Sequence, residues 1–356
     1  MRAALATVQL AALTQNLARA RTLARKARVM AIVKADGYGH GLERVARALS
    51  AADAFGVACI EDAERLRGLG MLHRIVLLAG FDEPADLRLV RALKLDCVLH
   101  DASQLQILQR ERGAPIRVWL KFDTGMHRLG FPIEQAAALC SQLREMPSVA
   151  PELHVMSHFA SADAQERGST EQQLALCLRH AQGLAAGISL ANSAALLAWP
   201  QSHHQWVRPG GILYGLSSFP GRTGPDLGFV PAMTLSTKLI AIKQLQAGDA
   251  VGYGGSYLAP HAMRIGIAAI GYGDGYPRHA ASGTPVLVDG QKCGTVGRVS
   301  MDLLAIDLSF APRAQAGSSV LLWGPKLPAE LVADAADTIS YELTCGVTRR
   351  VRFAEA

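Results

Sequence analysis

The sequence lacks the features that define several large classes of protein. Its six cysteines are far apart and include no C-x-x-C pair; they are Cys59, Cys97, Cys140, Cys177, Cys293 and Cys345. No apolar run approaches the length of a membrane span, and there is no internal repeat or low-complexity tract. This argues against a disulfide framework, a metal site, a membrane-spanning protein and a repeat array. We expect buried, reduced thiols in a cytoplasmic protein.

Concentrated charge of one sign is also missing. The chain has 36 Lys and Arg against 30 Asp and Glu, and the densest group of cations, residues 19–28, fits the polar face of one helix. Nucleic acid is therefore not an expected partner, whereas an anionic small substrate or cofactor would account for a few of the cations. Half of the residues are apolar, so a large core is expected.

Short β-rich runs alternate with longer amphipathic segments through the first part of the chain. The runs that we predict to be strands cover residues 29–33, 54–60, 74–79, 95–100, 116–122, 153–159, 187–191 and 211–216. The predicted helices cover residues 13–27, 41–50, 63–68, 102–110, 133–143 and 170–183. Eight such units in roughly 220 residues are what a (β/α)8 barrel requires, and a doubly wound sheet is the alternative. We predict the barrel.

A change of composition marks a second domain. Glycine and proline are frequent at residues 219–225, which indicates a linker. Beyond it lie β-like runs at 233–245, 264–270, 285–288, 294–299, 303–308 and 320–323, and one helical segment at 330–338. We therefore expect an α/β barrel domain over residues 1–222 and a mostly β C-terminal domain over 223–356. The first residues, about eight, are free to pair with the second domain.

A lysine at the end of a buried strand is the centre of the predicted site. Residues 29–33 are all apolar, Lys34 follows, and glycines come at 37, 39 and 41. Desolvation lowers the pKa of such a lysine, and a neutral amine is a nucleophile that can form a Schiff base. The simpler alternative is a solvated lysine beside Asp36.

Polar residues follow other predicted strands as well. Lys121 and Arg128 belong to an ionisable cluster around a glycine turn, where a solvated loop is the alternative. His158 is either catalytic or a histidine that only satisfies hydrogen bonds. Residues 191–194 and 207–215 carry small side chains, so their backbone N–H groups could approach an anion such as a phosphate.

Two glycine loops of the second domain carry tyrosines. Tyr253 lies in the loop 251–257 and Tyr272 in the loop 271–278. Tyrosines in such loops usually pack, but a phenol can also act as an acid or base when a nearby cation lowers its pKa.

In this order along the chain, the clusters resemble those of the alanine racemases, which are pyridoxal-phosphate enzymes with a barrel and a β domain. The resemblance rests on segments 31–41, 121–130, 157–163, 191–193, 207–215, 252–257, 271–278, 297–302 and 338–345. It implies pyridoxal 5'-phosphate as cofactor, alanine as substrate, and a homodimer with shared active sites. The product would supply D-alanine for peptidoglycan or L-alanine for catabolism.

The resemblance also implies roles for individual residues. Lys34 would hold the cofactor covalently and act as one base, and the partner subunit's Tyr253 would be the other. The remaining cofactor-binding residues would be Tyr38, His158, Ser193, Arg208, Gly210, Gly211 and Tyr341. Arg128 and Met301 would bind substrate. Support would come from Lys121, Asn192 and Asp302, and the substrate corridor would contain Asp163, Tyr272, Arg278, Arg298 and Ile339.

One departure and three alternatives stay open. Some family members carry a histidine three residues before the asparagine that corresponds to Asn192, and this chain has Ser189 there, so the support of Arg208 is expected to differ. Lys121 matches a lysine that is often carbamylated. The alternatives are a decarboxylase of the same architecture, a racemase of another small amino acid, and a non-catalytic cofactor carrier. Tyr253 favours a racemase, because racemisation needs a proton donor on the second face.

Overall fold

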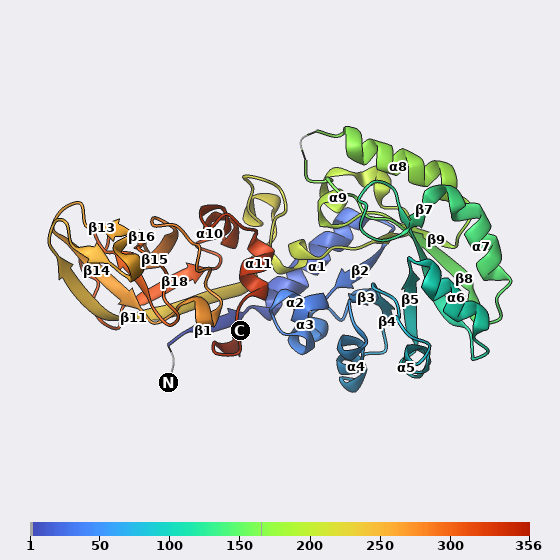
Figure 1. The fold of residues 1–356 in the computed structure, drawn as a ribbon, viewed down its shortest axis with the longest axis horizontal. Helices are drawn as coiled ribbons and strands as arrows, with labels where there is room; N and C mark the ends of the chain where they lie inside the picture. The colour runs from blue at the N-terminus through green and yellow to red at the C-terminus, as the bar shows by residue number, and fades with distance from the viewer. Residues whose placement is uncertain (1–2, 165) are drawn as a thin grey trace.

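The structure is a computed structural model that describes residues 3–164 and 166–356. Two bodies lie side by side, a barrel and a β-rich domain (Figure 1). Met1 and Arg2, which belong to the segment predicted to be free for pairing, lie outside the described residues.

Eight parallel strands close into a barrel, as predicted, and a doubly wound sheet is ruled out. They are β2 (Arg28–Ile32), β3 (Ala54–Val57), β4 (Arg74–Leu77), β5 (Leu95–Leu99), β6 (Ile116–Asp123), β8 (Val149–Met156), β9 (Gly187–Ser189) and β10 (Trp206–Val207). Pairing of β5 with β6 and of β10 with β2 completes the ring. A short strand, β7 (Phe131–Pro132), adds to β6 outside it.

The prediction of the eighth strand at 211–216 is wrong. The strand is β10, and the predicted run instead forms a short helix, η3 (Gly211–Tyr214). Pro209 lacks the N–H that would continue a ladder beyond β10. The apolar run packs on the first helix, where Asn16 Nδ2 donates to the Leu213 carbonyl at 3.0 Å. Burial alone did not distinguish this helix from a strand.

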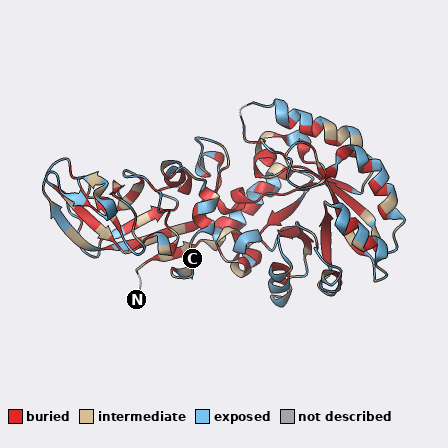
Figure 2. Ribbon diagram, viewed as in Figure 1, coloured by how far each residue is buried: buried red, intermediate tan, exposed pale blue. Residues whose placement is uncertain are grey.

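Helices cover the barrel with their apolar faces turned toward the strands (Figure 2). They are α1 (Leu10–Ala24), α3 (Leu42–Ala48), α4 (Ile60–Gly68), α5 (Asp86–Ala92), α6 (Ala102–Arg110), α7 (Ala136–Arg144), α8 (Gly168–Ala181) and α9 (Ser193–Ala198). The six predicted helices are present. Two others, α5 and α9, are short, with seven and six residues, and were not predicted.

The barrel interior explains where the polar site residues point. Its buried apolar cluster consists of Met30, Ile32, Ala54, Val76, Val98, Trp119, Met156 and Trp206. Side chains alternate between the two faces of a strand, so residues two positions beyond four of these also point inward, at the carboxyl end. Those four residues are Lys34, Lys121, His158 and Arg208.

The C-terminal domain is built on an antiparallel sheet, and its predicted β runs are confirmed. The main strands are β11 (Met233–Leu245), β14 (Met263–Ala268), β15 (Pro285–Val288), β16 (Gln291–Val296), β17 (Leu304–Asp307) and β18 (Ser319–Trp323). A bulge near Leu239 lets the long β11 pair with β18 in one half and with β14 in the other. A hairpin of β12 (Ala250–Val251) and β13 (Tyr257–Leu258) follows β11. The helix predicted at 330–338 is present as α10 (Ala329–Ala335), and a second helix, α11 (Ser340–Cys345), follows it.

The two ends of the described chain meet in this second sheet. Strand β1 (Leu5–Val8) lies between β11 and the last strand, β19 (Arg352–Glu355). Four cysteines are buried as predicted, but the prediction is wrong for Cys59 and Cys345. Both are exposed because they lie at helix ends, Cys59 directly before α4 and Cys345 at the end of α11. Across the described residues, none of the helices combines the length and the hydropathy that crossing a membrane would require.

Candidate active site

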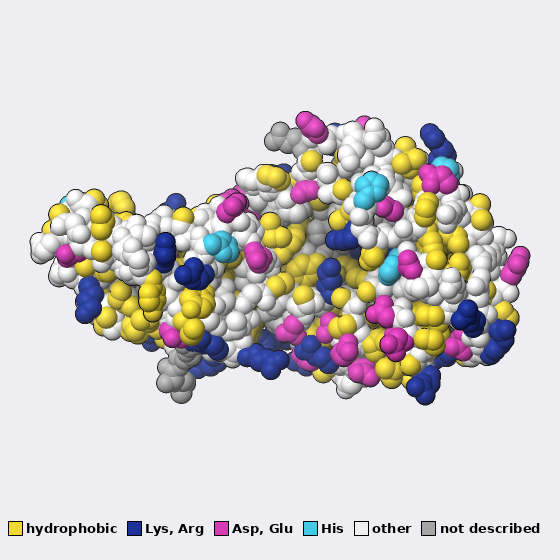
Figure 3. Space-filling view, viewed as in Figure 1, with side chains coloured by type: hydrophobic (Ala, Val, Ile, Leu, Met, Phe, Trp, Pro, Cys, Tyr) yellow, Lys and Arg dark blue, Asp and Glu magenta, His cyan; other side chains and the backbone are white. Residues whose placement is uncertain are grey.

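A pocket of about 450 Å³ opens where the barrel strands end. It faces the second domain, and Figure 3 shows a hollow in this region with Lys and Arg side chains inside it. The residues predicted to bind cofactor all line it: Lys34, Tyr38, His158, Ser193, Arg208, Gly210, Gly211 and Tyr341. Lys121, Arg128, Asp163 and Asn192 line it as well. The structure therefore brings these predicted residues together.

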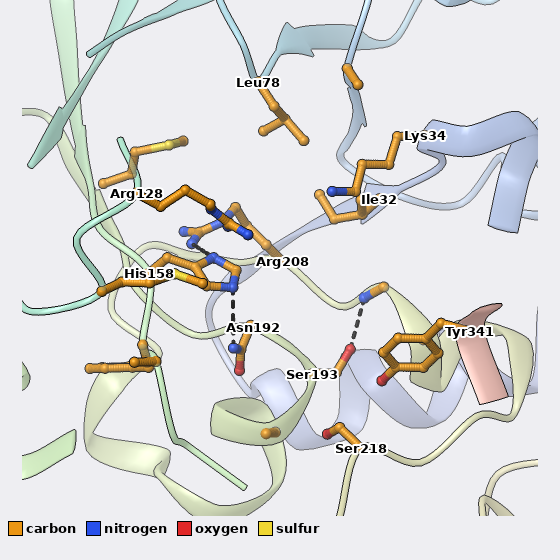
Figure 4. A pocket seen from close by; sticks show the side chains of 18 of the residues that line it. Ile32, Lys34, Leu78, Arg128, His158, Asn192, Ser193, Arg208, Ser218 and Tyr341 are labelled. Carbon is orange, nitrogen blue, oxygen red and sulfur yellow. Dashed lines mark hydrogen bonds between the residues drawn. The ribbon is translucent and has the colours of Figure 1, made fainter. Parts of the chain in front are cut away.

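Lys34 begins a tight turn at the end of β2. The segment α2 (Lys34–Tyr38) is left-handed, with φ of 54° at Ala35, 52° at Asp36 and 53° at Tyr38. Such a conformation costs a non-glycine residue roughly 1–2 kcal/mol. The side chain of Lys34 reaches into the pocket (Figure 4). Desolvation by the walls and the charge of Arg128 lower the pKa of its amine below the ordinary value.

Arg208 is a buried cation held entirely by neutral acceptors. Its Nη1 donates to the carbonyl and to the hydroxyl of Ser189, both at 2.7 Å, and its Nη2 donates to the Ser157 carbonyl at 2.6 Å. Burial lowers the pKa of Arg208 to about 10, so the guanidinium keeps its proton at neutral pH. The position that holds a histidine in some family members thus supports Arg208 here through a serine.

His158 lies between Arg208 and Asn192 (Figure 4). Its Nδ1 is 3.4 Å from Nη2 of Arg208, and its Nε2 is 3.5 Å from Nδ2 of Asn192. Burial, followed by the charges of Arg208 and Lys121, lowers the pKa of His158 well below 6.5. The ring is therefore neutral at pH 7, and its Nδ1 accepts the arginine N–H.

Positive charge dominates this wall of the pocket. Burial and then the charges of Arg208 and Arg128 lower the pKa of the Lys121 amine to about 8. Lys121 is therefore partly neutral near pH 7 to 8, which is a condition that carbamylation of an amine requires. Asp123, which the sequence places in the same cluster, instead accepts hydrogen bonds from three backbone N–H groups of its own loop.

Opposite these cations, two helix starts and two phenols form a cradle. The backbone N–H of Gly210 donates to Ser193 Oγ at 2.9 Å, which joins the start of η3 to the start of α9. A Cβ at Gly210 would lie 2.4 Å from the Tyr38 hydroxyl, and one at Gly211 would lie 2.4 Å from that of Tyr341. Burial raises the pKa of Tyr38 and raises that of Tyr341 to about 12, so both phenols stay protonated as donors. First-turn N–H groups and two hydroxyls suit a phosphate.

Among the described residues of the second domain that were predicted for the site, Tyr341 lines the pocket of its own chain, and the others do not. Tyr253 is 70% exposed, and its loop joins β12 to β13, at the end of the domain far from the barrel (Figure 1). Met301 is 50% exposed, and its carbonyl accepts from the N–H of Gly273 in the Tyr272 loop at 2.9 Å. Arg298 lies beside the Tyr253 loop, 3.2 Å from the position that a Cβ on Gly254 would take.

Other predicted residues of the second domain lie near this face or near the barrel. The Arg278 guanidinium is 6.0 Å from the centre of the Tyr272 ring. Asp302 forms an ion pair with Arg350. Ile339 is 61% exposed and lines a neighbouring cavity of about 440 Å³, which shares Asp163 and Tyr341 with the first pocket.

Several residues around the site carried no predicted role. Ser218 and Leu78 line the pocket, and His40 and Tyr214 pack behind α2. His40 lies in segment 31–41 and Tyr214 in segment 207–215, and both segments are predicted from the sequence to belong to the site. A polar residue within a glycine-rich segment is therefore the signal by which these two residues could have been found. Ser218 gave no signal, because its contact with the pocket depends on the path of the linker.

A parallel barrel followed by an antiparallel β domain, with a lysine, an anchored arginine and an anion cradle at the barrel mouth, defines a class of two-domain barrel enzymes. Residues 8–218 match the alanine racemase N-terminal domain and residues 232–354 match the alanine racemase C-terminal domain. The chain belongs to the alanine racemase family, and it is therefore an enzyme of the isomerase class.

Similar proteins agree over the whole length. The alanine racemase of Nitrosococcus oceani is 51% identical over 350 residues, covering 97% of each chain, and that of Vibrio cholerae is 46% identical, covering 99% of this chain and 98% of the other. The biosynthetic alanine racemase of Pseudomonas aeruginosa superposes with a TM-score of 0.97 at 44% identity and full coverage of both chains. The Bartonella henselae alanine racemase, solved with covalently bound pyridoxal phosphate, has a TM-score of 0.89 at 26% identity over both full chains.

Proposed function

We propose that this enzyme interconverts L- and D-alanine with pyridoxal 5'-phosphate, moving the α-proton between two bases. The observation that carries the proposal is the convergence of Lys34, Arg208 and the phosphate cradle on one pocket. Lys34 is one base, and the partner subunit's Tyr253 is the other.

The residues present fit a phosphorylated, planar cofactor. Because Gly210 and Gly211 have no Cβ, the hydroxyls of Tyr38 and Tyr341 lie directly against their backbone, beside Ser193. These hydroxyls and the first-turn N–H groups are the donors that would hold a phosphate. Lys34 lies within the same pocket as a partly desolvated amine, able to bond covalently to an aldehyde. When bound, the cofactor supplies the electron sink that makes an α-proton of an amino acid acidic.

Each polar residue then has a defined task. Lys34 Nζ takes the α-proton from one face or returns it, which its lowered pKa favours. Arg208 would lie against the cofactor ring and, because its carbonyl-anchored guanidinium keeps its proton, would not protonate that ring. Arg128 offers its charge to the substrate carboxylate, and a backbone group of Met301 from the partner subunit would assist it.

The exposure of Tyr253 supports a shared active site. Its phenol lies on a glycine loop far from its own barrel, and Tyr272 and Met301 are exposed on hydrogen-bonded loops of the same domain. In a homodimer, the surface of the second domain that carries Tyr253, Tyr272 and Met301 would cover the pocket of the other subunit. Tyr272, Arg278, Arg298, Asp163 and Ile339 would then line the route to it.

The test is α-proton exchange in D2O combined with chiral analysis of the product, starting from each enantiomer of alanine. We expect both exchange and racemisation, and we expect Lys34→Ala to lower them by roughly a hundredfold to ten-thousandfold. Carbon dioxide release would indicate a decarboxylase, faster turnover of another amino acid a different racemase, and binding without exchange a carrier.

Tyr253→Phe tests the second base separately. Proton removal from one enantiomer should slow more than from the other, because each base serves one face. Equal substrate isotope effects for both enantiomers in this variant would contradict the two-base scheme.

The remaining assignments are proposed on coarser grounds. Six unpaired cysteines fit a reducing compartment, so we assign the enzyme to the cytoplasm. We divide the chain after residue 222, beyond the last barrel element, with β1 belonging to the sheet of the second domain. The enzyme would supply D-alanine for peptidoglycan or L-alanine for catabolism.

A further inference from the structure

A buried histidine lies behind the turn that carries Lys34. His40 has no exposed surface, and its ring nitrogens form no hydrogen bond with an acidic side chain among the residues that the structure describes. Its Nδ1 is 2.8 Å from the Tyr38 carbonyl and 3.2 Å from the Gly37 carbonyl. Carbonyls only accept, so Nδ1 carries the proton and donates to both.

Tyr214 extends this contact to the strand that precedes the turn. The Tyr214 hydroxyl donates to the Ile32 carbonyl at 3.0 Å, at the end of β2. Its ring stacks on Tyr38 at 4.7 Å and lies 4.8 Å from the ring of His40. One buried pair of side chains therefore holds both ends of the segment that contains Lys34.

The turn needs such support. Residues 35 to 38 all have φ between 52° and 62°, although three of them are not glycine. A run of left-handed residues persists only where its surroundings determine it. If it relaxed, Lys34 and the Tyr38 hydroxyl would shift together, because they begin and end the turn.

We propose that His40 and Tyr214 are positioning residues that hold the left-handed turn, and so set where the Lys34 amine and the Tyr38 hydroxyl meet the cofactor. Neither touches the reacting atoms. The inference rests on the proposed function, because it concerns the affinity of the pocket for pyridoxal phosphate.

The test compares three variants of the cofactor-free chain. His40→Leu removes both hydrogen bonds, His40→Asn can place an amide N–H near the Nδ1 position, and Tyr214→Phe removes only the bond to Ile32. Two quantities are measured. The first is the dissociation constant for pyridoxal phosphate, obtained from the change in absorbance on binding. The second is the pH at which the absorbance of the bound cofactor is halfway through its change, called the pH midpoint, which reports the environment of the Lys34 amine. We expect His40→Leu to weaken binding about tenfold or more and to move the midpoint, Tyr214→Phe to weaken it less, and His40→Asn to recover most of the loss.

His73→Leu is the matched control. His73 also contacts a backbone carbonyl, that of Ser50 at 2.8 Å, and lies on a ring, that of Phe55 at 4.8 Å, but it precedes β4 at the opposite end of the barrel. A purely structural role for His40 predicts a lower melting temperature with an unchanged dissociation constant and pH midpoint, and that result would overturn the proposal.

The proposal can still be tested if one of the variants fails to fold. If His40→Leu does not fold, Tyr214→Phe decides, and wild-type affinity and midpoint in that variant would overturn the proposal. If the wild-type chain itself bound no pyridoxal phosphate, the proposed function would fail instead, so the two failures are distinguishable.

Discussion

At the scale of single residues, the buried charge of Arg208 is stabilised by hydrogen bonds to neutral acceptors. Arg208 has carbonyls and a serine hydroxyl as acceptors rather than a carboxylate. None of these acceptors titrates between pH 5 and 8, as a histidine can, and the Nδ1 of His158 is a longer contact at 3.4 Å. Ser189 therefore gives Nη1 of Arg208 an acceptor that does not titrate in this range, whereas a histidine at this position would.

Ser189→Ala tests this support. The variant removes the acceptor for Arg208 Nη1 at 2.7 Å and the donor to the Trp206 carbonyl at 3.0 Å. Because one partner is charged, we expect the free energy of unfolding to fall by about 2 kcal/mol, measured by urea denaturation.

The matched control is Ser202→Ala. Ser202 is equally buried, and its hydroxyl donates to the Trp199 carbonyl at 2.7 Å without a charged partner, so about 1 kcal/mol is expected. Equal losses in the two variants would contradict a special role for Ser189.

His40 makes a prediction about pH. Burial lowers its pKa from 6.5 to about 4, and the nearby charges of Arg44 and Asp36 oppose each other; the ring of Tyr214 and the backbone carbonyl of Tyr38 also face it. The unfolded chain therefore binds the proton more readily, so His40 leaves the free energy of unfolding unchanged well above pH 6.5 and lowers it as the pH falls from 6.5 toward 4.

Between pH 7 and pH 5 this loss amounts to about 2 kcal/mol. Urea denaturation of the cofactor-free chain should therefore show a steeper pH dependence for wild type than for His40→Asn, which cannot titrate. Parallel curves would show that His40 does not contribute.

At the scale of elements, the alternation of side chains along the strands builds the site. Lys121 follows Trp119 by two residues, and Arg208 follows Trp206 in the same way, so an apolar layer lies directly below a layer of cations. Such a layer could be predicted from the sequence because strand ends and polar residues coincide. The position of η3 could not, since its apolar run satisfies the pattern of a strand equally well.

Gly211→Ala tests the cradle at the start of η3. The added Cβ would lie 2.2 Å from Cε1 of Tyr341, while the backbone conformation suits alanine. The ring must move, so we expect binding of pyridoxal phosphate to weaken about tenfold or more. Adding Tyr341→Ala should make the two effects non-additive, which a double-mutant cycle measures.

Gly168→Ala is the corresponding control. Gly168 begins α8, no atom lies within 4 Å of the added Cβ, and its φ is not positive. Its affinity should equal that of wild type, and an equal loss in both variants would contradict the steric explanation.

At the scale of the whole molecule, the sequence predicted a barrel followed by a β domain, and it predicted many of the residues that line one pocket. Lys34, His158 and Arg208 converge because the ends of barrel strands meet, which is a property of the fold. Tyr253 could not be located in this way. Its side chain is exposed on a loop far from its own barrel, so neither the periodicity of the sequence nor the folded single chain places it at a site.

Mixing two inactive variants tests that assembly. Lys34→Ala and Tyr253→Phe should each racemise slowly as pure proteins. In a mixed dimer with shared sites, one site combines Lys34 of one subunit with an intact tyrosine from the other, and the second site lacks both. Random reassortment of equal amounts makes about half of the dimers mixed, with one working site in two, so about a quarter of wild-type activity should return.

The expected recovery depends only on whether Tyr253 serves the pocket of its own chain or that of the other subunit. If Tyr253 served the pocket of its own chain, both sites of every mixed dimer would lack one base, and mixing would restore nothing. Lys34→Ala mixed with a Lys34→Ala, Tyr253→Phe double variant is the control, because no combination of those chains contains an intact lysine. Recovery there would show contamination, whereas recovery only in the first mixture requires that the tyrosine act across the subunit boundary.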